Sequence, residues 1–200
     1  MFKMMNNARL GVGVECLALA ERALQQASAF ALERRQGKAI GAQAGEQSLI
    51  IEHPDVRRML LTMRAYTDAM RCVLYANAAA LDVAKCHPDA EERQSASDRA
   101  ELLTPISKAW CTDLGVEMTS LGIQVHGGYG YIEETGAAQH LRDSRISPIY
   151  EGTNGIQAID LVGRRLRMGE GKVMRDLLDE IGGFVEGLAE MGPEYETIKV

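Results

Sequence analysis

The sequence has few aromatic residues, no long apolar run and no excess of positive charge. Aromatic residues make up 5% of its 200 positions, with one tryptophan and three phenylalanines, which disfavours the stacking platforms that bind single-stranded nucleic acid. The formal net charge of −6 argues against nucleic acid or an anionic membrane as a partner. No apolar run approaches the roughly 20 residues of a membrane span, and residues 1–5 lack the apolar stretch of a secretory signal. We therefore expect a cytoplasmic protein.

Cysteine motifs are also absent. The four cysteines, Cys16, Cys72, Cys86 and Cys111, lie far apart, and none forms a C-x-x-C pair. This spacing gives poor support to zinc chelation or to a thioredoxin-like motif, so we expect no bound metal. Isolated thiols of an intracellular protein are most often small buried apolar groups, which is the role we expect here.

Helical periodicity runs through most of the chain, whereas no segment shows convincing strand alternation. The spacing of apolar and small residues predicts long helices over about residues 4–35, 53–87 and 91–121. Pro105 is expected to kink the third helix or to delay its start. The glycines within residues 37–45 predict a loop. The pattern is typical of an all-α, up-down helical bundle.

Two of these helices carry stripes of large apolar residues that we expect to form the core, with methionine as an adaptable packing residue. The stripes are Met59, Met63, Tyr66, Met70 and Val73, then Leu103, Ile106, Trp110, Leu114, Met118 and Leu121. In the first helix, Gly11 and Gly13 lower helix propensity but allow another helix to approach closely.

The residue composition of the sequence changes beyond residue 121. Residues 122–131 are dense in glycine and predict a loop. A further helix is expected over about residues 155–167, with Thr153 or Asn154 as its N-cap. The chain then continues in one more amphipathic stretch, which we expect Gly182-Gly183 to interrupt.

Three features of this second half are candidates for chemistry. The glycine-dense segment could turn backbone N–H groups toward a phosphate, but it matches no P-loop and follows no strand, so a tight helix crossing is favoured. His126 has no second histidine nearby, which favours a structural role. Glu151 stands between an aromatic residue and a glycine, just before a helix. It is either a general base in a desolvated turn or an acid that complements the helix dipole.

Three runs of residues carry a specific resemblance. They are Q-V-H-G-G-Y-G-Y at 124–131, L-R-D-S-R-I at 141–146 and I-Y-E-G-T-N-G-I-Q at 149–157. Together they resemble the C-terminal signature of the acyl-CoA dehydrogenases. Arg9 and residues 30–34 fall at the spacing of the same family, and the resemblance covers essentially residues 4–167.

The resemblance implies a piece of a larger flavoenzyme. Members of the family comprise an N-terminal helical domain, a middle β domain and a C-terminal helical bundle, and only the bundle matches this chain. Residues 5–9, 53–58 and 136–143 are also similar to a larger bacterial subgroup that includes 3-methylmercaptopropionyl-CoA dehydrogenase. We therefore expect residues 1–168 to form the C-terminal bundle and residues 169–200 to begin a truncated C-terminal extension.

The resemblance assigns the chemistry to Glu151. This residue matches the family's catalytic base, which removes the α-proton of an acyl-CoA thioester while a hydride leaves the β-carbon for flavin N5, giving a trans-2-enoyl-CoA. In the family, the backbone N–H of the same residue donates a hydrogen bond to the thioester oxygen. Tyr150 and Gly152 are expected to line the acyl site, and Arg9 is expected near the CoA end.

The implied cofactor is FAD, held between two subunits. Arg34 matches an arginine that grips the pyrophosphate of the FAD in a neighbouring subunit, a task that suits a guanidinium. Gln124 and Gly128 match contacts to that neighbour's FAD, and Thr153 matches a contact to the flavin of its own subunit. These assignments imply a homodimer or a tetramer, with electron-transferring flavoprotein as the usual electron acceptor.

Three functions follow from the sequence as alternatives. The leading hypothesis is the C-terminal domain of an FAD-dependent acyl-CoA dehydrogenase, inactive as a separate piece. An acyl-CoA oxidase has the same fold and differs in how oxygen reaches the reduced flavin, which these residues do not reveal. A non-catalytic helical oligomerisation module is the alternative from a different class.

Overall fold

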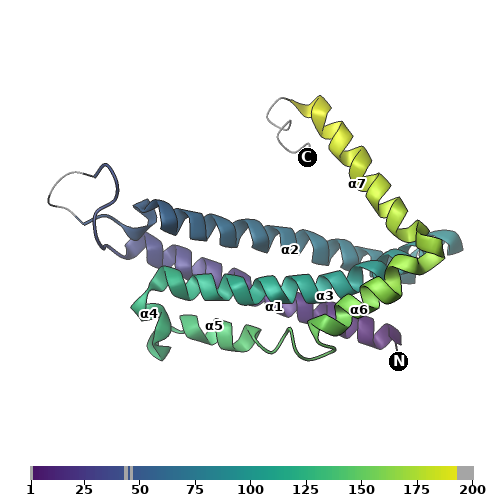
Figure 1. The fold of residues 1–200 in the computed structure, drawn as a ribbon, viewed down its shortest axis with the longest axis horizontal. Coiled ribbons are helices and arrows are strands. Elements are labelled where there is room, and N and C mark those ends of the chain that lie inside the picture. The colour runs from purple at the N-terminus through teal and green to yellow at the C-terminus, as the bar shows by residue number, and fades with distance from the viewer. Residues whose placement is uncertain (1, 43–44, 46, 193–200) are drawn as a thin grey trace.

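Three long helices form the frame of the molecule. The structure is a computed structural model that describes residues 2–42, 45 and 47–192. The long helices are α1 (Phe2–Glu33), α2 (Pro54–Cys86) and α3 (Ala90–His126). They run up, down and up beside one another (Figure 1). Within the described ranges the only β pairing is one isolated bridge, between Arg35 and Leu49, so the predicted all-α, up-down bundle is confirmed.

The junction between α2 and α3 lies where the sequence predicts it. Pro54 begins α2, where its missing N–H costs nothing. The helix ends before His87, which is extended because Pro88 disfavours helical angles at the preceding residue. Asp89 then caps α3, and its carboxylate accepts a hydrogen bond of 2.7 Å from the Glu91 N–H.

Residues that weaken helices stand inside α1 and α3. Pro105 lies within α3 and does not delay its start at Ala90, so that part of the prediction is wrong. Gly13 and Gly115 mark close crossings of the two helices. A Cβ added to Gly115 would lie 2.3 Å from Cys16 Sγ, and one added to Gly13 would lie 2.8 Å from a backbone oxygen of α3. Small residues at these points therefore let the two backbones approach, as expected for Gly13.

The core lies between the three long helices and is rich in methionine and alanine. Met63 and Met70 have no exposed surface, and each contributes about 2 kcal/mol through burial. Two members of the predicted stripes are exposed, since Tyr66 is 41% exposed and Trp110 is 36% exposed. On α2 the neighbouring Thr67 takes the inward position instead. Three more members of the stripes are only half-buried and lie outside the core cluster: Val73, Leu103 and Ile106.

Shorter elements return along the bundle after α3. They are α4 (Gly128–Tyr131), η2 (Glu133–Thr135), α5 (Ala137–Ser144) and α6 (Asn154–Gly163). Residues 122–126 continue α3 and do not form the predicted loop, because Gly122 packs against Ala23 of α1 while the helix satisfies the backbone. Thr153 is the N-cap of α6, and its hydroxyl accepts a hydrogen bond of 3.4 Å from the Ile156 N–H.

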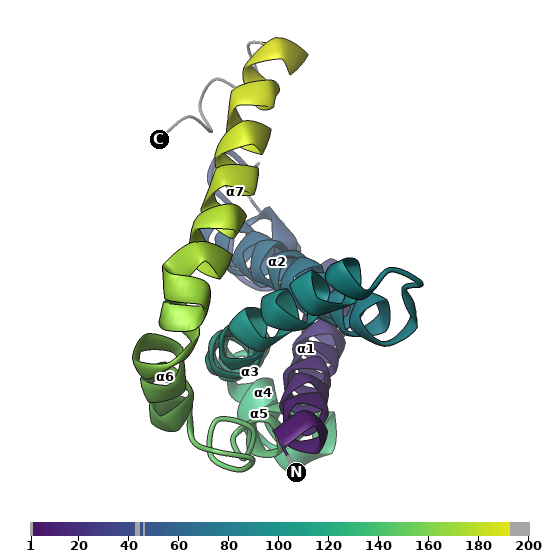
Figure 2. The same ribbon diagram turned by 90° about the vertical axis from the view of Figure 1, so that its right-hand side faces the viewer.

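The last helix leaves the bundle. Backbone angles at residues 168–170 depart from helical values within η3 (Arg165–Gly171), and α7 (Lys172–Met191) then points away from the other helices (Figure 2). Gly182-Gly183 lies inside α7, so the predicted interruption is wrong. Two glycines cost roughly 1 kcal/mol each in a helix and do not break this one. Among the described residues, no helix combines the length and the apolar character needed to cross a bilayer. The expected cytoplasmic location stays a prediction.

The cysteines divide into two pairs by exposure. Cys16 and Cys111 are buried, and burial raises their thiol pKa values to about 11 and about 12. Cys72 and Cys86 are exposed on α2, so the expectation of buried thiols is wrong for these two.

Candidate active site

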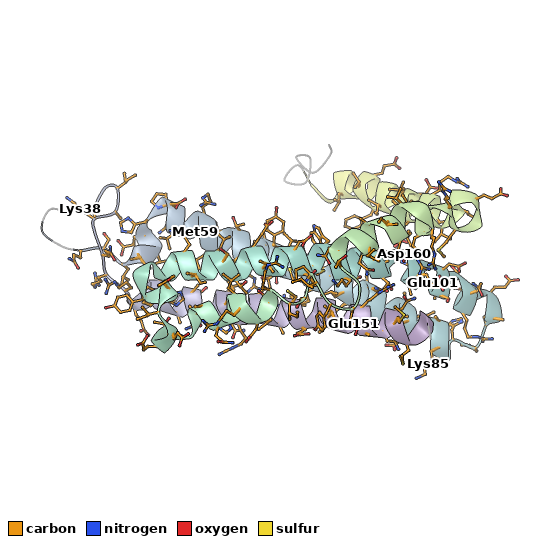
Figure 3. All side chains as sticks on the ribbon, turned by 60° about the horizontal axis from the view of Figure 1, so that its bottom comes forward. Lys38, Met59, Lys85, Glu101, Glu151 and Asp160 are labelled. Atoms are coloured by element: carbon orange, nitrogen blue, oxygen red, sulfur yellow. The ribbon has the colours of Figure 1, made fainter. Side chains whose placement is uncertain are left out.

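Glu151 lies in a tight turn between α5 and α6 whose backbone is strained. The φ angle is 56° at Glu151 and 87° at Gly152, both in the left-handed region, which costs a non-glycine residue roughly 1–2 kcal/mol. A hydrogen bond of 3.1 Å from the Asn154 N–H to the Pro148 carbonyl closes the turn. Figure 3 shows Glu151 on this connection, where it passes α1. Such strain persists only where the surrounding contacts fix it.

Two buried side chains supply those contacts at the Glu151 carbonyl. Arg9 of α1 donates from Nε over 3.3 Å, and Gln157 of α6 donates from Nε2 over 3.5 Å. Gln157 also donates to the Gly152 carbonyl over 3.2 Å. Because both donors belong to helices packed in the bundle, they hold the turn against the frame of the molecule.

These contacts leave the carboxylate and the N–H of Glu151 available. The side chain is exposed, and no described residue donates a hydrogen bond to it or pairs with it. Nor does any described residue accept a hydrogen bond from its N–H. The desolvation expected for this turn is therefore not provided by the described part of the chain. A carboxylate and an N–H donor on one residue are therefore both accessible to a ligand.

Tyr150 ties the turn to α1. Its hydroxyl donates to a carboxylate oxygen of Glu15 over 2.5 Å. Partial burial and this neighbouring carboxylate raise the pKa of the Tyr150 hydroxyl to about 12, so it stays protonated and keeps donating near neutral pH.

The other predicted cofactor contacts lie at the opposite end of α1. Arg34 follows the last residue of α1, and its sequence separation from Arg9 corresponds to about 37 Å along a helix. The Arg34 guanidinium carbon lies 5.2 Å from the centroid of the Tyr129 ring. Gln124 is exposed in the last turn of α3, and no heavy atom lies within 4 Å of a Cβ placed on Gly128. The structure thus brings Arg34, Gln124 and Gly128 together at one end of the bundle, apart from the Glu151 turn.

His126 lies in the core at that same end. Its Nδ1 is 2.7 Å from the Gly122 carbonyl oxygen, and its ring stacks on Phe30 with 4.5 Å between centroids. The residue is 6% exposed. These contacts support the structural role that the sequence favoured.

Comparison with known proteins identifies the family. Residues 1–166 match the family model described as "Acyl-CoA dehydrogenase, C-terminal domain". The chain is 46% identical over 198 residues to 3-methylmercaptopropionyl-CoA dehydrogenase of Ruegeria pomeroyi. This match covers 99% of this chain and 34% of that protein. The chain belongs to the acyl-CoA dehydrogenase family.

Two further relatives are much longer than the part that matches this chain. It is 29% identical over 166 residues to the caffeyl-CoA reductase–Etf complex subunit CarC of Acetobacterium woodii, covering 82% of this chain and 38% of that subunit. A crystal structure of an acyl-CoA dehydrogenase complexed with FAD from Bacillus anthracis superposes with a TM-score of 0.71 at 27% identity, covering 96% of this chain and 32% of that one. The chain thus spans about a third of the length of these relatives.

Lys108 and Thr112 of α3 also hold the turn, through Asn154. The acyl-CoA dehydrogenase motifs did not point to either residue. Asn154 accepts a hydrogen bond of 2.8 Å from the ammonium of Lys108, and its Nδ2 donates to Thr112 over 2.9 Å. Lys108 has no exposed surface, and burial lowers the pKa of its ammonium. The sequence gives little indication of this contact. Lys108 and Thr112 lie one helical turn apart and so share a helix face, but lysine is usually exposed. The burial of Lys108 is therefore visible only in the structure.

Proposed function

We propose that this chain is the C-terminal, base-carrying domain of an FAD-dependent acyl-CoA dehydrogenase, which converts an acyl-CoA thioester to a trans-2-enoyl-CoA. The observation that carries the proposal is the turn at Glu151, where an available carboxylate and an available N–H belong to one residue. Membership of the acyl-CoA dehydrogenase family supports the type of reaction.

In the proposed reaction, Glu151 is the base that removes the α-proton of the thioester. Its N–H donates to the thioester oxygen, on which negative charge develops as the proton leaves. Arg9 and Gln157 hold the carbonyl of the same residue, so the base stands in a fixed orientation and less freedom is lost in the transition state. FAD, when bound, supplies the acceptor for the hydride that leaves the β-carbon.

The far end of the bundle fits the phosphates of FAD. Arg34 presents a planar guanidinium that suits a pyrophosphate, and the Tyr129 ring supports it by its face. The amide of Gln124 is exposed and the space around Gly128 is open, so both residues are able to contact the same pyrophosphate. This donor set is appropriate for a dinucleotide, so we assign it to FAD.

Each FAD is proposed to be shared between subunits. Thr153 lies with the Glu151 turn and contacts the flavin of its own subunit, whereas Arg34 reaches the FAD of the neighbour. The roughly 37 Å between the two ends of α1 supports this division, because the two groups are far apart within one chain. The proposed assembly is a homodimer or a tetramer.

The proposal also covers the substrate, the electron acceptor and the domain boundaries. The substrate is an acyl-CoA, with Arg9 toward the CoA end and with Tyr150 and Gly152 at the acyl site. Electron-transferring flavoprotein is the proposed acceptor, supported by the relative whose name places it in an Etf complex. Residues 1–168 form the bundle and residues 169–200 begin an extension, supported by the break in the helix at residues 168–170.

The test replaces the base in a full-length enzyme that contains this chain. A Glu151→Gln variant should bind FAD, yet acyl-CoA should bleach the flavin band about 10²–10⁴-fold more slowly, because the amide does not accept the α-proton. Glu134→Gln, which changes an exposed carboxylate of η2, is the matched control and should bleach at the normal rate. Normal bleaching by the Glu151→Gln enzyme would refute the assignment.

A further inference from the structure

The buried cation Lys108 lies beside the Glu151 turn and forms no ion pair with any described residue. It has no exposed surface, and within the described chain its ammonium donates only to Asn154 Oδ1, over 2.8 Å. A buried ammonium normally has a carboxylate partner, because removing a charge from water costs several kcal/mol. An apolar residue of the same size would fill this space without that cost. The charge therefore needs an explanation beyond packing.

Asn154 joins this cation to a carboxylate. Its Nδ2 donates to Asp113 Oδ1 over 2.7 Å and to Thr112 Oγ1 over 2.9 Å. The orientation of the amide is dictated by its neighbours: Lys108 can only donate and the Asp113 carboxylate can only accept, so the oxygen faces one and the NH₂ group faces the other. These three neighbours belong to α3, as does the Ala109 carbonyl, which accepts from the same Nδ2 over 3.1 Å, and together they hold the Asn154 side chain in one position.

Asn154 is also one end of the turn that carries the base. Its N–H donates to the Pro148 carbonyl over 3.1 Å, and the two residues with positive φ, Glu151 and Gly152, lie between these ends. A strained backbone keeps its conformation only when its surroundings over-determine it. Asn154 is therefore one of the restraints on the Glu151 turn, beside Arg9 and Gln157, and displacing it removes that restraint.

We propose that Lys108 is a positioning residue for the reaction and acts through Asn154 to fix the Glu151 turn. The effect on catalysis rests on the proposed function, whereas the effect on the turn is a property of the chain itself. A lysine that merely fills space would affect the stability of the whole bundle. A lysine that positions the turn affects residues 149–157 in particular.

The first experiment measures amide hydrogen exchange in this chain. Lys108→Met keeps an unbranched side chain that is one heavy atom shorter, and it removes the donor. Exchange at residues 149–157 should become about tenfold faster, while α1 and α2 keep their rates. Lys85→Met, which changes an exposed lysine of α2, is the matched control and should change neither region. Unchanged exchange at residues 149–157, or a uniform increase over the whole bundle, would overturn the proposal.

The second experiment is a double-mutant cycle in the full-length flavoenzyme. Lys108→Met should slow flavin reduction by acyl-CoA about 100-fold, with the half-saturating acyl-CoA concentration changed by less than about twofold. In an Asn154→Leu background the same substitution should have no further effect, because the relay is already absent. Effects that multiply in the double variant would overturn the proposal.

The outcomes separate this inference from the proposed function. If a single variant does not fold, the exchange test passes to the double variant, in which both partners are apolar and neither leaves the other unpaired. Faster exchange at residues 149–157 in that variant supports the proposal, and the wild-type rate overturns it. A Glu151→Gln enzyme that still bleaches refutes the proposed reaction and leaves the exchange result intact.

Discussion

At the scale of single residues, Gly152 shows how closely the turn is fitted. Its φ of 87° suits glycine, and a Cβ there would lie 2.7 Å from the Gln157 Nε2 that donates to its carbonyl. We predict that Gly152→Ala lowers stability by about 1–3 kcal/mol and slows flavin reduction in the full-length enzyme about 100-fold. Urea unfolding and anaerobic mixing measure the two effects. Gly155→Ala, where no heavy atom lies within 4 Å, is the control, and equal losses in both variants would contradict the prediction.

The buried thiols give a prediction about pH. Burial raises the pKa of Cys111 to about 12, above its ordinary value of 9.0. Above that ordinary value the unfolded chain loses a proton that the folded chain keeps, so the thiol's contribution is complete at lower pH and is lost as the pH rises. The free energy of unfolding should therefore fall between about pH 8 and pH 10, and by about 1.4 kcal/mol less in Cys111→Ala than in the exposed control Cys72→Ala. Identical pH dependence in the two variants would show that Cys111 ionises normally in the folded state.

The limit of sequence-based inference at this scale is visible in three side chains. Glu151 is a candidate from the sequence because a contiguous run of family residues surrounds it, and its catalytic role stays a prediction. Tyr66 was misplaced because apolar spacing of three and four fits two adjacent helix faces, and only packing decides which face is buried. Lys108 was missed because residue type predicts exposure for a lysine, and its partner Asn154 lies far from it in the sequence.

At the scale of elements, the crossing of α1 and α3 depends on glycine. A Cβ on Gly115 would lie 2.3 Å from Cys16 Sγ, so Gly115→Ala should force the helices apart and cost about 1–3 kcal/mol. Gly11→Ala is the control, since nothing lies within 4 Å of its Cβ and it should gain up to about 1 kcal/mol from helix propensity. Thermal unfolding measures both changes, and a shift of the same sign in the two variants would count against a close crossing at Gly115.

Element boundaries followed from the sequence wherever a local signal sets them. Pro54, Pro88 and Asp89 act on their own backbone or on the adjacent turn, so the ends of α2 and the start of α3 were predictable. Glycine was the misleading signal. Gly122 serves packing against α1, and Gly182-Gly183 costs too little to break α7, so neither ends a helix.

At the scale of the whole molecule, the proposed site is divided. The proposed base Glu151 is exposed, although a carboxylate base works best away from water. Exposed isoleucines flank its turn: Ile146, Ile149, Ile156 and Ile159. The chain spans about a third of the length of its relatives, so surfaces outside it are expected to cover this region. The sequence pattern of this chain predicts which residues form the turn, but it does not locate the surfaces that would cover it.

The proposed division of the site between subunits can be tested by combining two inactive variants of the full-length enzyme. If Arg34 serves the FAD of the neighbour and Glu151 serves its own subunit, full-length Arg34→Ala and Glu151→Gln variants should each be nearly inactive alone. In a mixed dimer, one site then combines an intact Glu151 with an intact Arg34, while the other site lacks both. Random co-assembly should restore about a quarter of wild-type activity, measured as acyl-CoA-dependent flavin reduction after co-expression. Activity no higher than the mean of the two single variants would place both residues on one FAD within one subunit.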